Sequence, residues 1–257
     1  MITFPFSVDF SLGRVSYTSF SQQTLMELLL SDIDGASFIC EEMTAVKDVQ
    51  HWKNVTVNDQ GDVTVIDWDD MRLAGTMNFD CIPSTAVVVK IGWNQLNGPL
   101  HLAGMPPFLE ILHLRNNKLH GSMDLRSLPD GLQDLNLSTN RFSGSIDLRS
   151  LPKNLHRLSM SNNQLSGPID ISRLNSAIKS LVLYGNQFSG PLCLDRLPVS
   201  LESIYLNDNL FSGWVDLSTI PKTLANLHLS RNDQLSGRLP RNGPKNVLFQ
   251  GTHIEVE

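Results

Sequence analysis

The 257-residue chain has little of what several classes of protein depend on. Its three cysteines, Cys40, Cys81 and Cys193, are scattered, so they form neither a closely spaced metal-binding pair nor a disulfide framework. No apolar run approaches the roughly 18 residues that cross a bilayer, and the N-terminus does not have the pattern of a signal peptide. The net charge of −6 argues against a nucleic-acid partner.

Motifs for nucleotide binding, zinc-dependent proteolysis and a nucleophilic serine are also missing. The seven histidines are dispersed, and no pair has the spacing of metal ligands. The densest acidic run contains Asp67, Asp69 and Asp70. We interpret it as a solvated acidic edge, because a hard cation usually needs more oxygen ligands. The sequence therefore predicts no catalytic residue, no metal site and no cofactor.

What the sequence does contain is a pattern that repeats every 23 residues. The unit reads L-x-x-L-x-L-x-x-N-x-[LF]-S-G-x-I-D-L-x-x-L-P-x-x, and Met71 takes the place of the asparagine in the first of eight units. The asparagines that follow are Asn94, Asn117, Asn140, Asn163, Asn186, Asn209 and Asn232.

The unit has a direct physical interpretation. The L-x-L alternation predicts a short strand with one buried face. One coil cannot bury its own leucines, so neighbouring coils must stack on both sides of it. The asparagine follows the strand where the chain turns away, and its amide satisfies backbone groups that no strand partner reaches. Stacking therefore predicts a buried structural ladder of asparagines.

The pattern resembles that of leucine-rich repeat proteins, and its S-G-x-I segment is similar to the plant-type and kinetoplastid subclasses. The resemblance implies an α/β solenoid shaped like a horseshoe, with short parallel strands on the concave face and an irregular convex side. We expect an N-terminal cap at 1–62, eight repeats at 63–240 and a C-terminal capping segment at 241–257. The cap should contain a helix after Ser21 and a second one at about 40–50.

The cap also resembles that of plant-type repeat proteins, which normally carries paired cysteines. Here Val57 stands where one of them is expected. This departure favours a reducing compartment.

The strand positions between the leucines point outward, and they vary from unit to unit. Acidic residues come first along the chain, and basic and aromatic residues follow in the middle. Each of these residues alone could be a solvated strand residue, but Trp, Tyr and Arg together are typical of binding hot spots. The predicted partner-binding residues are Lys90, Trp93, His113, Arg115, Lys118, Arg141, Tyr184 and Tyr205.

The sequence thus predicts a non-enzymatic, cytoplasmic scaffold or adaptor, a subunit of a larger assembly. It would bind a protein partner with an acidic segment on its concave face, without inserting into a membrane. The alternative is a secreted or cell-surface recognition module that binds a host protein or a glycan. Glycan on Asn54, which begins the sequence Asn-Val-Thr, would favour this alternative. An enzyme whose activity resides in a cap is the third possibility.

Overall fold

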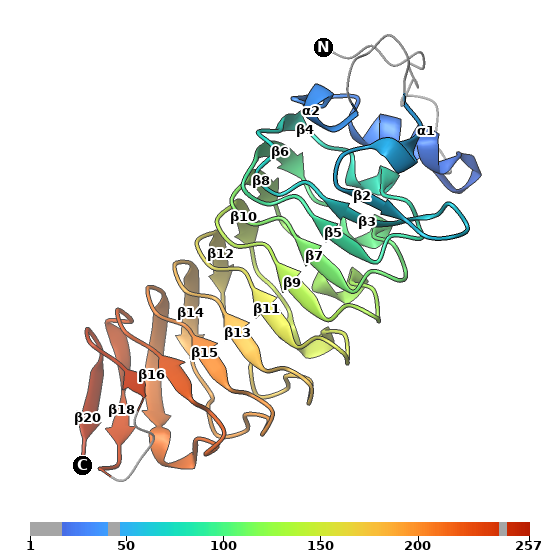
Figure 1. The fold of residues 1–257 in the computed structure, drawn as a ribbon. Coiled ribbons are helices and arrows are strands. Elements are labelled where there is room, and N and C mark those ends of the chain that lie inside the picture. The colour runs from blue at the N-terminus through green and yellow to red at the C-terminus, as the bar shows by residue number, and fades with distance from the viewer. Residues whose placement is uncertain (1–16, 41–46, 242–245) are drawn as a thin grey trace.

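The computed structural model describes residues 17–40, 47–241 and 246–257. The chain winds into an elongated stack of coils, with two α-helices at the N-terminal end and strand β20 at the other (Figure 1). Each coil contributes one strand to each of two ten-stranded sheets, and short turns join the two sheets. This is the repeat solenoid that the 23-residue period predicts.

The first sheet contains the L-x-L segments. Neighbouring strands are parallel and shifted by one repeat, so that Leu135, Leu158 and Leu181 lie side by side. At the two ends, β2 (Val55–Val57) is antiparallel to its neighbour and β19 (Val247–Leu248) is parallel. The strands between them are β3 (Val63–Asp67), β5 (Val88–Lys90), β7 (Ile111–His113), β9 (Asp134–Asn136), β11 (Arg157–Ser159), β13 (Ser180–Val182), β15 (Ser203–Tyr205) and β17 (Asn226–His228).

The second sheet contains the x-[LF]-S-G segments, for which the sequence predicted no strand. The Leu or Phe of each segment points into the core, and the residues on either side of it are more exposed. Its strands are β1 (Ile33–Asp34), β4 (Ala74–Thr76), β6 (Gln95–Pro99), β8 (Lys118–Gly121), β10 (Arg141–Gly144), β12 (Gln164–Gly167), β14 (Gln187–Pro191), β16 (Leu210–Asp216), β18 (Gln234–Leu239) and β20 (His253–Val256).

Short 3₁₀ turns follow several of these strands on the way back to the first sheet. In four of the five turns, an Asp or Asn side chain accepts a hydrogen bond from the backbone N–H two residues later and so begins the turn. The turns are η3 (Phe79–Cys81), η4 (Leu102–Gly104), η5 (Leu125–Ser127), η6 (Leu148–Ser150) and η7 (Leu217–Thr219).

The described part of the N-terminal region begins with a 3₁₀ turn at Tyr17–Ser19, and helix α1 follows at Gln22–Leu29. The Ser21 hydroxyl caps this helix by accepting a hydrogen bond from the Thr24 N–H at 3.1 Å. A four-residue helix, α2, spans Ser37–Cys40, and a 3₁₀ turn spans Val49–His51. Most of the second helix expected at 40–50 lies outside the described residues.

The core is a column of apolar side chains between the two sheets. Apart from Leu248 in the last strand, the leucines of the first sheet are at most 2% exposed. The rings of Phe188 and Phe211 stack with centroids 6.3 Å apart and planes inclined by 12°. The seven asparagines that end the L-x-L segments are between 0% and 9% exposed. Packing of this density is the main source of stability in a stack whose coils contact only their neighbours.

Each of these asparagines joins two coils through hydrogen bonds. The Asn163 side-chain oxygen accepts a hydrogen bond from the Phe142 N–H of the preceding coil at 3.0 Å. Its amide nitrogen donates to the Leu137 carbonyl of that coil and to the Met160 carbonyl of its own, both at 3.1 Å. The other asparagines follow the same pattern, so the backbone groups at the turn are satisfied from coil to coil.

Candidate functional site on the concave face

The chain leaves the first sheet through a backbone conformation that recurs in all eight repeats. The residue just before the asparagine position has a φ between +53° and +67°. This left-handed region favours Gly and Asn, yet a Trp, a Thr and an Arg also occur in the set. Its members are Asp70, Trp93, Asn116, Thr139, Asn162, Gly185, Asp208 and Arg231.

This conformation places Trp93 at the edge of the concave face, where 53% of the residue is exposed. The guanidinium carbon of Arg115, from the next repeat, lies 5.6 Å from the centre of the Trp93 ring. At this distance the cation and the ring attract each other. The Arg115 Nε is buried and has no hydrogen-bond partner, and we find no ion pair of Arg115 in the described part of the chain.

A network of charged side chains lies beside this pair. Lys90 on β5 is 3.4 Å from the carboxylate of Asp67 on β3. The His113 Nε2 lies 3.2 Å from Asp134 on β9, and Arg157 on β11 donates to the same carboxylate at 2.7 Å. Burial raises the pKa of Asp134, but the contacts with His113 and Arg157 outweigh it and hold that pKa below its usual value.

Aromatic side chains occupy the C-terminal half of the face. Tyr205 on β15 and His228 on β17 are neighbours in register, and their rings meet edge to face with centroids 6.4 Å apart. Burial lowers the pKa of His228, and the nearby Asp208 carboxylate opposes that effect. Tyr184, which is half-buried, follows β13 in the preceding coil. The side chains described in this half of the face are thus mainly aromatic rings rather than unpaired charges.

The structure brings some of the predicted residues together and separates others. Trp93 is in contact with Arg115, and Lys90 lies beside His113 on the neighbouring strand. Lys118 and Arg141 instead begin β8 and β10, so they belong to the second sheet. The left-handed residue turns the chain before these positions, which is why counting outward positions along a continuous strand placed them on the concave face.

Two residues that carry the charged network were missing from the predicted set. Asp134 is 8% exposed, and Arg157 is its partner from the following coil. The available signal was an acidic residue in a strand of the repeat that follows a histidine. Because His113 and Asp134 are 21 rather than 23 residues apart, they meet diagonally, and alignment of the repeats in columns does not pair them.

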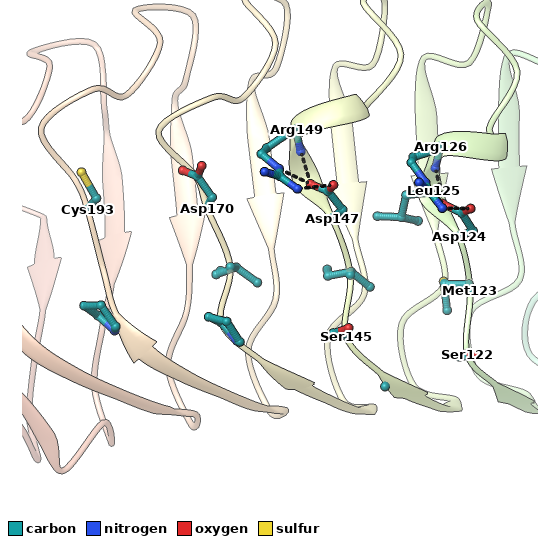
Figure 2. A pocket seen from close by; sticks show the side chains of 15 residues that line it. Ser122, Met123, Asp124, Leu125, Arg126, Ser145, Asp147, Arg149, Asp170 and Cys193 are labelled. Atoms are coloured by element: carbon teal, nitrogen blue, oxygen red, sulfur yellow. Dashed lines mark hydrogen bonds and ion pairs between the residues drawn. The ribbon is translucent and has the colours of Figure 1, made fainter.

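A hollow of about 1130 Å³ lies elsewhere, beside the 3₁₀ turns that follow β8 and β10 and the segments that follow β12 and β14 (Figure 2). Within it the Asp124 carboxylate is paired with Arg126 at 2.8 Å, and Asp147 is paired with Arg149 at 2.9 Å. The hydrogen bond from Arg149 lowers the pKa of Asp147 to about 2. Since these carboxylates already start the turns and pair with arginine, the concave face is the better candidate site.

The whole architecture is that of a solenoid repeat protein with a curved sheet on one side. The sequence pattern of the leucine-rich repeat family matches residues 154–174. The structure of pollen receptor kinase 3 is similar, with a TM-score of 0.56 and 22% identity over 79% of this chain and 95% of that chain. The chain thus has the repeats and the fold of leucine-rich repeat proteins. No curated protein sequence matches it significantly.

Two further solved structures show the same fold. The ectodomain of the plant membrane receptor kinase GASSHO1/SCHENGEN3 from Arabidopsis thaliana was solved in complex with CASPARIAN STRIP INTEGRITY FACTOR 2. It has a TM-score of 0.60 and 19% identity over 91% of this chain and 36% of that chain. A plant ice-binding protein has a TM-score of 0.50 and 18% identity, covering 92% and 94%. In the described part of the present chain, no helix is long and apolar enough to cross a membrane.

Proposed function

We propose that this protein is a non-enzymatic recognition module whose concave face binds an acidic segment of a protein or peptide. The observation that carries the proposal is the pair of Trp93 and Arg115. An exposed indole offers a large, rigid apolar surface, and a guanidinium is a planar fork that matches a carboxylate. The Nε of this guanidinium is buried without a hydrogen-bond partner. An incoming carboxylate would compensate for that loss.

The surrounding charges support an acidic partner at this point of the face. Lys90 and Arg157 already pair with Asp67 and Asp134, so their charges are largely compensated. Arg115 differs because the contact that we find for its guanidinium is with an aromatic ring, which leaves its positive charge uncompensated. We propose that the carboxylate binds here and that the rings of the C-terminal half pack against the apolar part of the partner.

The place where recognition occurs is part of the proposal. The receptor ectodomains among the similar structures favour display at a cell surface or secretion. The three free thiols of this chain favour the intracellular adaptor. Asn54 provides a test because it is exposed and begins a glycosylation sequence. A glycosidase-sensitive mass shift that disappears in Asn54→Gln would establish passage through the secretory pathway, whereas recovery of unmodified protein from the cytosol supports the adaptor.

The binding proposal is tested with random peptides displayed on phage and selected on the immobilised protein. We expect the wild type to enrich peptides that contain Asp or Glu. In the double variant Trp93→Ala/Arg115→Glu, the affinity of a selected peptide should fall by about thirty-fold or more, as is typical of hot-spot truncation. The melting temperature should change by only a few degrees, because both side chains lie on the surface of the face.

A matched control places the same changes on the second sheet. Trp214 is 64% exposed there, and Arg141 is an exposed cation on the same sheet. Trp214→Ala/Arg141→Glu changes the net charge by the same amount and should leave peptide affinity unaltered. An equal loss in the two double variants would show that binding depends on overall charge or on the second sheet, and the concave proposal would then be wrong.

A further inference from the structure

A groove of 750 Å³ with a largely apolar lining lies at the N-terminal end of the stack, between helix α1 and the turns η3 and η4. Leu25, Ile82 and Met105 line it and are between 4% and 8% exposed. Tyr17 and Phe20 also line it, with ring centroids 6.4 Å apart, and both are half-buried. Concave, apolar and partly open surfaces of this kind normally receive another apolar group.

The chain that leads to this groove has an unusual pattern. In the sequence ITFPFSVDFSL, residues 2–12, every even position is apolar and every odd position is Thr, Pro, Ser or Asp. Strict alternation over eleven residues is typical of an extended segment that buries one face. Three of the six apolar residues are phenylalanines, Phe4, Phe6 and Phe10. Left in water, they would form an exposed apolar stripe.

We propose that residues 2–12 dock in this groove with their even-numbered side chains against Leu25, Ile82 and Met105. Continuity of the chain favours this occupant over a separate molecule. Tyr17 lines the groove itself, so the docking segment is tethered only a few residues away, and a short tether gives an effective concentration in the millimolar range. Pro5 has no backbone N–H, which is tolerated in a segment at the edge of a structure.

The inference is independent of the concave face. It assigns to the first residues of the chain the covering of an apolar surface that the helical region leaves open. The turns η3 and η4, which belong to the first two repeats, would then be shielded from water, which is the role of a terminal cap in a solenoid.

The test compares two double variants of the full chain that differ only in the face they alter. Phe6→Asp/Phe10→Asp puts two charges on the apolar face, and Ser7→Asp/Ser11→Asp puts the same charges on the polar face. Hydrogen exchange is measured by mass spectrometry at residues 79–83 and 102–107. We expect exchange there to accelerate by roughly tenfold or more in the phenylalanine variant and to stay within twofold of wild type in the serine variant.

Three results would overturn the proposal. Wild-type exchange rates in both variants would show that the segment does not cover the groove. Equal acceleration in both would show an effect of charge alone. A wild-type dimer that becomes monomeric only in the phenylalanine variant, judged by light scattering, would show that the stripe docks on a second copy. If the aspartates prevent folding, Phe6→Ala/Phe10→Ala compared with Ser7→Ala/Ser11→Ala answers the same question.

Discussion

Replacing Asn163 by alanine removes the hydrogen bonds of its side chain to the preceding coil and to its own coil, and the losses are unequal. The Phe142 N–H donates to the Asn163 side-chain oxygen, so it would be left buried without a partner after the substitution. The carbonyl of Leu137 also accepts from Asn140, and that of Met160 also accepts from Asn186. Each of these two carbonyls therefore keeps one donor after the substitution.

The size of the stability loss follows from these unequal contributions. A buried N–H without a partner costs about 1–3 kcal/mol, and each of the two shared bonds contributes about 0.5 kcal/mol. Asn163→Ala should therefore lower the free energy of unfolding by about 2–4 kcal/mol. For a chain of this size, that loss corresponds to a fall in melting temperature of roughly 5–15 °C. Circular dichroism during a thermal scan measures it directly.

The neighbouring Asn162 supplies the control. Its side chain is exposed and its φ is +53°, which glycine adopts freely and alanine does not. Asn162→Gly should leave the melting temperature nearly unchanged, and Asn162→Ala should cost about 1 kcal/mol through backbone strain alone. If Asn162→Gly lowers the melting temperature as much as Asn163→Ala, the interpretation of the buried asparagines is refuted.

Three more outcomes are expected. Thr139 is an exposed β-branched residue with a φ of +56°, so Thr139→Asn should raise the unfolding free energy by about 0.5–1 kcal/mol in chemical denaturation, and a loss would contradict the strain argument. The pKa of Asp134 is lowered in the fold, so the stability it contributes above about pH 4 is lost as the pH falls through its folded pKa. Denaturation between about pH 5 and 3 should accordingly show a shallower loss of stability in Asp134→Asn than in the wild type, and identical slopes would exclude this contribution. Burial raises the pKa of the Cys81 thiol to about 12 and Cys40 is also buried, so a thiol reagent should label native protein at the exposed Cys193 alone and all three cysteines after denaturation.

The 23-residue period predicted most of the architecture, because every unit must bury the same apolar positions against its neighbours. Leu155, Leu158 and Met160 are fully buried, as the L-x-x-L-x-L spacing requires. The second sheet did not follow from the same pattern. Gly and Ser are poor strand formers, and the S-G segment forms strands only because an equivalent segment lies beside it in each neighbouring coil.

The left-handed backbone conformation at the edge of the concave face also could not be predicted from the sequence. Glycine at 185 and asparagine at 162 favour that conformation, but tryptophan at 93 and threonine at 139 do not. The stacked coils impose the turn on whichever residue occupies the position. The pairing of Trp93 with Arg115 could be predicted from adjacent repeats, whereas the diagonal contact of His113 with Asp134 depends on the stagger between coils.

The sharing of carbonyls between successive asparagines has a consequence for how the length of such a protein can change. Every complete coil receives the same set of hydrogen bonds from the coil before it and passes the same set to the coil after it. Removal or duplication of one whole 23-residue unit therefore creates no unpaired backbone group, whereas a change of any other length does. The separation between Trp93 in the second repeat and Tyr184 in the sixth, four strands at about 4.8 Å each, is adjustable only in steps of one coil. The distance between two contact points for a partner can therefore change only by whole multiples of the spacing between coils.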